Sequence, residues 1–164
     1  YKDKFDKIAL GKPLLTSDED FKQVIAAITN DTKEYLDGET AICFMGHGTE
    51  ADSNKVYATL QEKLKAAGYN DYFVGTVEAK PSVDDLIAQV KESGKYKRVI
   101  LQPLMVVAGD HANNDMAGDG EDSWVSKFKA AGFEVKPVLR GLGQNYDIQK
   151  IYLEHLKAAI DSLK

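Results

Sequence analysis

The chain has 164 residues, of which 43% are hydrophobic and 29% charged, a composition typical of a globular protein and not of a disordered one. Its net charge of −5 argues against nonspecific binding to nucleic acid or to an anionic membrane, because both need an excess of Lys and Arg. The single cysteine excludes an internal disulfide and any CxxC motif, and no apolar run approaches the roughly 18–20 residues that cross a bilayer.

The first forty residues predict a helix preceded by a linker. Two hydroxyl residues followed by three acids, at 16–20, are typical of a helix start, and Gly38 ends the segment. Residues 1–16 are interpreted as a linker. Because the chain begins with Tyr1 and shows no secretory signal, we expect a fragment or a processed form of a cytoplasmic protein, with export of the intact protein left open.

After Gly38, short apolar runs alternate with helical patterns. The expected strands are residues 41–45, 72–77, 98–107 and 134–139, and the expected helices are residues 54–67, 81–94, 123–131 and 148–163. The third run is the most apolar and is expected to be a central strand, whereas Pro137 indicates that the fourth is an edge strand.

This alternation predicts an α/β fold, a three-layer domain with a four-stranded parallel sheet flanked by helices, over residues 39–164. The strand runs are apolar on both sides, which fits a parallel sheet covered on both faces. Residues 1–38 are interpreted as a linker or the tail of a preceding domain.

Three residues that can bind a metal follow three successive predicted strands. His47 follows the first strand in Gly46-His47-Gly48, Glu78 follows the second, and His111 follows the third. Ligands in open parallel sheets bind beyond the carboxyl ends of the strands, and neighbouring strands are about 4.8 Å apart. We therefore expect the two imidazoles and the carboxylate to converge at one rim.

Such a trio suits a divalent first-row metal such as Co, Ni, Fe or Zn, and leaves coordination positions open for a substrate. The alternative interpretation is that each residue is an ordinary polar residue of a loop. The order of metal affinities for such ligands does not distinguish cobalt from nickel or iron.

The acidic stretch at 110–122 allows three interpretations. Residues 115–120 resemble the start of an EF-hand, but Ala117 and Ser126 stand where calcium ligands are needed. The stretch is otherwise a solvated loop or a mobile active-site loop, and we favour the last because His111 opens it.

Other candidate residues are expected to be structural. Cys43 is expected to be a buried hydrophobe, His155 a helix residue with a structural role, and Trp124 and Phe128 inward-packed side chains rather than ligand-stacking ones. Residues 141–143 (GLG) are interpreted as a plain turn, because no complete nucleotide-binding motif is present.

Several of these segments resemble one family. They are GKPLL (11–15), FMGHG (44–48), GTVE (75–78), PLMVVAGDHANNDMA (103–117), DSW (122–124) and GLG (141–143). Together they look like the anaerobic cobalt chelatases, the sirohydrochlorin cobaltochelatases of the class II chelatase superfamily. The likeness covers essentially the whole chain and corresponds to the C-terminal portion of the family.

The resemblance implies two similar α/β domains with a tetrapyrrole cleft between them, so residues 1–38 are interpreted as the tail of a preceding chelatase domain. It implies insertion of Co²⁺ into sirohydrochlorin, or its precursor precorrin-2, in anaerobic cobalamin biosynthesis. By position, His47, Glu78 and His111 are the metal ligands and catalytic residues, with His111 as the proton acceptor. Cobalt is the substrate metal, and no nucleotide is implied.

The resemblance also implies partners: a tetrapyrrole, and either the missing N-terminal domain or a second copy of the chain. A fragment of this kind is expected to bind metal, and to turn over only when a cleft is rebuilt. Met105 and Val107 are expected either in the core or against the macrocycle. The sequence departs from the family at residues 49–52, where family members often carry further His and this chain has none. This absence argues against an auxiliary metal-delivery role for the segment. The alternative function is a non-catalytic carrier of tetrapyrrole or divalent metal.

Overall fold

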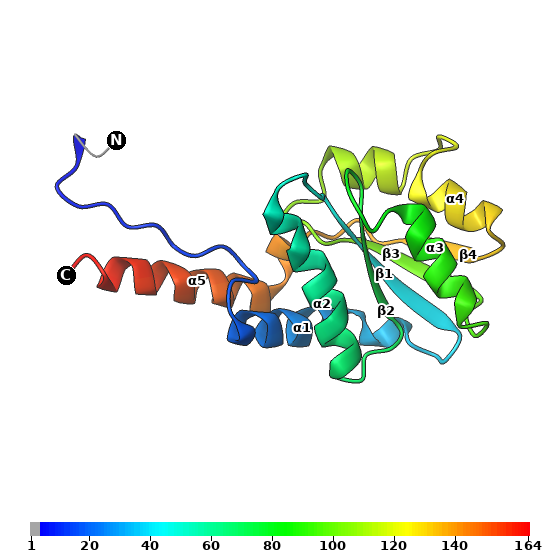
Figure 1. Cartoon of the computed structure of the whole chain (residues 1–164), viewed down its shortest axis with the longest axis horizontal. Helices are drawn as coiled ribbons and strands as arrows, with labels where there is room; N and C mark the ends of the chain where they lie inside the picture. The colour runs from blue at the N-terminus through cyan, green and yellow to red at the C-terminus, as the bar shows by residue number, and fades with distance from the viewer. Residues whose placement is uncertain (1–3) are drawn as a thin grey trace.

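A four-stranded sheet runs through the middle of the molecule, with helices on both faces, in a computed structural model that describes residues 4–164 (Figure 1). The strands are β1 (Thr40–Gly46), β2 (Tyr72–Thr76), β3 (Arg98–Pro103) and β4 (Glu134–Pro137). The α-helices are α1 (Asp18–Thr32), α2 (Lys55–Ala66), α3 (Val83–Glu92), α4 (Trp124–Ala130) and α5 (Tyr146–Asp161). Shorter turns are the 3-10 helices η2 (Lys33–Tyr35), η3 (Asp52–Asn54) and η5 (Leu142–Gln144) and the π-helix η4 (Ala112–Met116).

The sheet has the strand order β2-β1-β3-β4, and all three strand pairings are parallel. The predicted fold class is therefore confirmed, with β3 inside the sheet and β4 at its edge. Met45 of β1 lies opposite both Gly75 of β2 and Pro103 of β3. The carboxyl ends of these three strands therefore reach the same level, which brings the loops that follow them together.

Side chains of β1 alternate between two apolar cores, one on each face of the sheet. Ile42 and Phe44 point to the face covered by α1, α2 and α5, while Cys43 and Met45 point to the face covered by α3, α4 and η4 (Figure 1). Cys43 is fully buried, as predicted, and burial raises the pKa of its thiol. Trp124 and Phe128 of α4 are also buried in this second core, again as predicted.

Strand β3 ends at Pro103, four residues earlier than predicted. The Leu104 amide still donates to the Met45 carbonyl of β1 at 2.7 Å, but from Met105 onward the main chain bonds to the turn η5. The Leu142 amide donates to the Met105 carbonyl at 2.8 Å. The Gly143 amide donates to the Val106 carbonyl at 2.9 Å. The residues after Pro103 are apolar, but they form a loop at the carboxyl edge of the sheet.

Helix α1 begins as predicted, with the Ser17 hydroxyl accepting a hydrogen bond from the Asp20 amide. Its apolar side chains, including Val24 and Ile28, share a core with Phe44 of β1. The division of the chain into residues 1–38 and 39–164 stays a prediction, to which the structure adds that α1 packs directly on the sheet.

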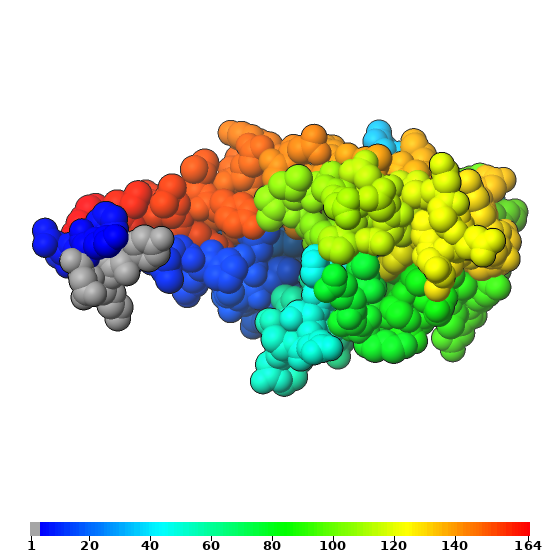
Figure 2. Space-filling view, turned by 90° about the horizontal axis from the view of Figure 1, so that it is seen from above, coloured from blue at the N-terminus to red at the C-terminus, as the bar shows by residue number. Residues whose placement is uncertain are grey.

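The C-terminal half of α5 extends beyond the body of the molecule, beside the segment that precedes α1 (Figures 1 and 2). The Lys7 ammonium donates to the Leu163 carbonyl at 2.6 Å, and His155 Nδ1 lies 2.8 Å from the Lys12 carbonyl oxygen. Within residues 4–164, the structure contains no helix with the length and apolarity needed for a membrane span. The cytoplasmic location stays a prediction.

Candidate metal centre

The loops that follow β1, β2 and β3 meet at one edge of the sheet and carry the three predicted ligands. His47 directly follows β1, Glu78 lies two residues after β2, and His111 stands at the start of η4. Figure 2 looks down on this side of the molecule, where the yellow-green segment after β3 lies beside the green and cyan ones. The structure therefore brings together residues that are far apart in the sequence.

Backbone hydrogen bonds place Glu78 beside His47. The Val77 amide donates to the Gly46 carbonyl at 3.0 Å, and the Glu78 amide donates to the His47 carbonyl at 2.9 Å. These bonds continue the pairing of β1 with β2 past the ends of both strands. The main chain thus sets the relative position of the two residues, and the His47 ring is held further by Nδ1, which lies 2.9 Å from the Gly48 carbonyl oxygen.

The three side chains lie close enough to share one ion. His47 Nδ1 is 3.7 Å from Glu78 Oε2, and His111 Nε2 is 3.9 Å from Glu78 Oε1. The two imidazole rings meet edge to face, with centroids 4.7 Å apart, and one ligand atom from each residue lies within 4.8 Å of the others. An ion bound at about 2.1 Å in tetrahedral geometry needs its ligand atoms about 3.4 Å apart, so small side-chain movements close the site.

All three ligands are accessible from solvent. The exposed fraction of the side chain is 47% for His47, 53% for Glu78 and 31% for His111. Two imidazoles and one carboxylate form a borderline-soft ligand set that suits Co²⁺ and its neighbours in the first row. Because the rim is open, an ion held there keeps positions for water or for a second ligand.

Two glycines allow the chain to pass through this crowded region. A Cβ atom on Gly46 would overlap the ring of Tyr57. Gly48 has a φ of +87°, and a Cβ atom there would lie 2.9 Å from both Thr76 Cβ and the Ala79 amide nitrogen. The GHG sequence thus has a physical basis, because His47 is presented between two positions that only glycine fits.

The third ligand, His111, has a partner that sequence reasoning missed. His111 Nδ1 lies 2.5 Å from Asp115 Oδ2, four residues later in the same helical turn. The sequence signal is the spacing of four residues, which places two side chains on the same side of a helix. That signal has meaning only in a helix, and the composition of the segment indicates a loop.

The prediction of a loop over residues 110–122 is wrong for the first half of that stretch. Residues 112–116 form the π-helix η4, in which Ala112 and Met116 are fully buried. These two side chains pack in the core beneath α4, so the turn is anchored by apolar contacts that a loop prediction does not anticipate. Short π-helices are frequent at functional sites.

His155 has the structural role that was predicted for it. Its ring bridges the Lys12 carbonyl, at 2.8 Å from Nδ1, and the Asp20 carboxylate, at 2.9 Å from Nε2. It therefore joins α5 to the start of α1 and takes no part in the trio.

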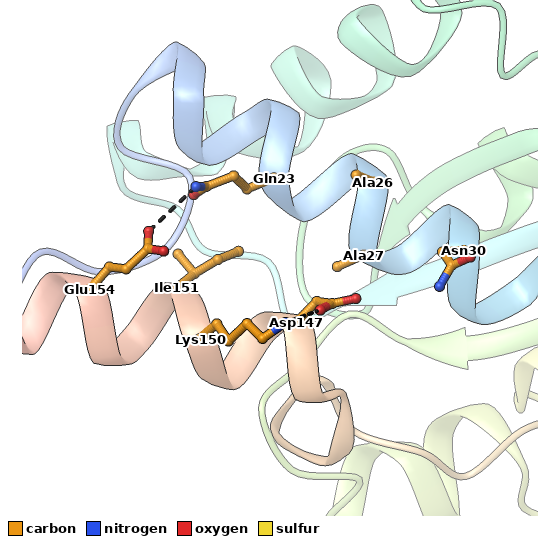
Figure 3. Close-up of a pocket in the computed structure, with 8 residues that line it drawn as sticks. All are labelled: Gln23, Ala26, Ala27, Asn30, Asp147, Lys150, Ile151 and Glu154. Carbon is orange, nitrogen blue, oxygen red and sulfur yellow. Dashed lines mark hydrogen bonds and ion pairs between the residues drawn. The ribbon is translucent and has the colours of Figure 1, made fainter.

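A groove of about 370 Å³ lies between α1 and α5 and is drawn in Figure 3. Four of its polar side chains form two pairs: Gln23 donates to Glu154 at 3.4 Å, and Lys150 donates to Asp147 at 3.1 Å. Its floor contains Ala26, Ala27 and Ile151. None of its lining residues belongs to the trio, and the groove offers no second cluster of metal ligands.

The chain is similar to proteins of known family. It is 40% identical over 157 residues to a sirohydrochlorin cobaltochelatase of Salmonella typhimurium, covering 96% of this chain and 58% of that protein. It is 32% identical over 161 residues to the sirohydrochlorin cobaltochelatase CbiKC of Nitratidesulfovibrio vulgaris, covering 98% of this chain and 56% of that one. The chain thus spans between half and two thirds of the length of these relatives.

Comparison with solved structures supports the fold. A cobalamin biosynthesis CbiX protein of Marinobacter aquaeolei VT8 superposes with a TM-score of 0.58 at 17% identity, covering 75% of this chain and 98% of that one. The sequence model of the family described as "Cobalt chelatase (CbiK)" matches residues 1–161. The chain therefore belongs to the CbiK family of cobalt chelatases.

Proposed function

We propose that this chain inserts Co²⁺ into sirohydrochlorin, or into its precursor precorrin-2, as the metal-holding part of a cobaltochelatase of anaerobic cobalamin biosynthesis. The observation that carries the proposal is the convergence of His47, Glu78 and His111 within 4.8 Å at the open edge of the sheet. The names of the two relatives support the choice of metal and tetrapyrrole.

The reaction requires three events: the ion loses bound water, two pyrrole N–H groups lose their protons, and the four nitrogens take the ion. In the proposal, His47 and Glu78 hold Co²⁺ at the rim, where their relative position is fixed by the backbone. His111 Nε2, the ring nitrogen that faces Glu78, contacts the ion first; when the ion passes to the macrocycle, the freed Nε2 accepts one pyrrole proton, and the second proton leaves to water at the open rim. Insertion exchanges one divalent cation for two protons, so the charge balances without a nucleotide.

Apolar side chains beside the rim support a macrocycle as the substrate. Val106 and Val107, in the loop after β3, are 46% and 71% exposed. Met105 is instead half-buried and packs against the core beneath α3 and α4. Of the two side chains that were expected either in the core or on the substrate, Val107 is therefore the one available to the substrate.

The proposed cleft needs a second wall, which we assign to a second α/β domain or to another copy of this chain. Large apolar side chains on the exposed side of α5 support a partner. They are Tyr146, Leu153, Leu156 and Ile160, each more than half exposed.

The substitution His111→Ala tests the proposal. We expect it to lower the rate of cobalt insertion by roughly 10²–10⁴-fold, because a positioned proton acceptor contributes about that much. The measurement is the absorbance change of sirohydrochlorin with Co²⁺, repeated over a range of protein concentrations, because activity that needs a second copy rises more steeply than linearly. Far-UV circular dichroism checks that the variant folds. His155→Gln serves as the matched control, because it removes a histidine outside the trio.

Turnover separates the enzyme from a carrier. An enzyme releases more than one equivalent of cobalt-sirohydrochlorin per chain, whereas a carrier retains a stoichiometric amount. Full activity of His111→Ala, or retention without release at every concentration, contradicts the proposal.

A further inference from the structure

The contact between His111 and Asp115 suggests a role for the acid that the trio alone does not include. Among the residues that the structure describes, His111 is the only hydrogen-bond partner of the Asp115 carboxylate, at 2.5 Å from Nδ1. The other ring nitrogen, Nε2, lies 3.9 Å from Glu78 Oε1. One edge of the imidazole therefore contacts the acid, and the opposite edge faces the proposed ion.

The helical turn that carries both residues, η4, is anchored to the apolar core. Ala112 and Met116, each one position after His111 or Asp115, are fully buried in the apolar core. The turn is therefore fixed while His111 and Asp115 remain on its accessible side, with side-chain exposed fractions of 31% and 44%. The ring orientation of His111 depends on its side-chain contacts, because the helical backbone restricts χ1 to a few rotamers but leaves the ring torsion χ2 broad.

The chemistry of a neutral imidazole makes this contact directional. Such a ring carries one N–H, and a carboxylate only accepts hydrogen bonds. Asp115 therefore favours the tautomer with the proton on Nδ1, which leaves the lone pair of Nε2 free. The opposite tautomer would place a proton on Nε2, where it blocks both binding of an ion and acceptance of a pyrrole proton.

We propose that Asp115 is a positioning residue, which fixes the tautomer and orientation of His111 so that Nε2 faces the ion shared with His47 and Glu78. The inference rests on the proposed function for its choice of ion. Acids that hold a metal-ligating histidine in this way commonly change metal affinity by roughly 10- to 100-fold when they are removed.

The first measurement reads the tautomer without metal or substrate. Long-range ¹H–¹⁵N spectra of the metal-free chain at about pH 8.5 distinguish the two ring nitrogens, and the chain has only three histidines to assign. We expect the Nδ1–H form for His111 in the wild type and in Asp115→Asn, because the amide oxygen of Asn still accepts the bond. We expect a shift toward the Nε2–H form in Asp115→Ala.

The second measurement is Co²⁺ affinity by isothermal titration calorimetry. We expect Asp115→Ala to bind roughly 10- to 100-fold more weakly than the wild type, and Asp115→Asn to recover most of that loss. Asp110→Asn is the matched control: it removes an acid from the same segment, but Asp110 bonds to Asn114 at 2.7 Å and not to a ligand of the trio. It should bind Co²⁺ within a few-fold of the wild type.

A double substitution tests whether Asp115 acts through His111. In a His111→Ala background, Asp115→Ala should cause no further loss of Co²⁺ affinity. A further loss of tenfold or more would show that the acid binds the ion itself and would overturn the inference, as would an unchanged His111 tautomer in Asp115→Ala. If both measurements agree with expectation but the wild type inserts no cobalt, the proposed function fails while the role of Asp115 stands.

Discussion

At the scale of single residues, each ligand of the candidate centre is held by a different contact. The backbone pairs Glu78 with His47, the glycines on either side of His47 leave room for it, and Asp115 orients His111. The geometry of this candidate site therefore depends as much on the residues around the trio as on the three candidate ligands themselves.

The substitution Gly48→Ala is expected to destabilise the chain and weaken metal binding. A Cβ atom at a φ of +87° is strained, and it would also lie 2.9 Å from Thr76 Cβ and the Ala79 amide. We expect a loss of about 2–3 kcal/mol in the free energy of unfolding, measured by urea denaturation, and a reduced Co²⁺ affinity.

Gly94→Ala is the matched control for this prediction. Gly94 has a φ of +62°, but a Cβ atom added there would meet nothing within 4 Å, so only the backbone strain of about 1 kcal/mol applies. Co²⁺ affinity should not change. Equal effects of the two substitutions on stability and affinity would contradict the steric argument.

The convergence of the three candidate ligands was predictable from the sequence, but the contacts that support them were not. Each of His47, Glu78 and His111 follows a predicted strand, and the ends of neighbouring parallel strands must meet. The role of Asp115 was not predictable, because a π-helix anchored by Met116 cannot be read from a polar, glycine-containing segment. Contacts made by tertiary packing override the local composition there.

At the scale of elements, apolar patterning was enough to predict the fold. The prediction fails where segments outside the sheet bond to each other. Strand β3 is shorter than its apolar run predicts because Met105 and Val106 pair with η5 at the edge of the sheet. The pairing of α5 with the start of α1 through His155 also depends on residues more than a hundred positions apart. Local patterns contain no signal for either contact.

The contact between α1 and α5 is expected to make stability depend on pH. Asp20 is buried, which by itself raises the pKa of its carboxyl, but hydrogen bonds from Thr16 and His155 outweigh burial and lower that pKa to about 2, from 3.8. Because the folded state prefers the charged form, this contribution to stability is complete above about pH 4 and is lost as the pH falls toward 2. It amounts to about 2 kcal/mol.

Urea denaturation between about pH 2 and pH 6 measures this effect. Asp20→Asn should lower the free energy of unfolding relative to the wild type by about 2 kcal/mol more at pH 6 than at pH 2. Glu19→Gln is the control, because it removes an exposed acid of the same helix that makes no hydrogen bond to His155. A constant difference between Asp20→Asn and the wild type across this range would contradict the argument.

At the scale of the whole molecule, an ion at the rim would connect the ends of β1 and β2 with η4. An ion that binds only the folded chain stabilises it by about 2.7 kcal/mol at a hundred times its dissociation constant. For a chain of this size we expect the melting temperature to rise by roughly 5–10 °C, measured by differential scanning calorimetry with Co²⁺. Glu78→Ala should abolish the rise, and an undiminished rise in that variant would place the ion elsewhere.

The three candidate ligands differ in how the backbone holds them, and this difference determines how the site adapts to ions of different radius. His47 and Glu78 are joined by a continuous ladder of main-chain hydrogen bonds, so their backbone positions are fixed relative to each other. His111 stands on the separate turn η4, which is anchored by the buried Ala112 and Met116. A change in ionic radius is therefore accommodated by rotation of the His111 side chain together with that of Asp115, while the backbone of η4 and the sheet stay in place.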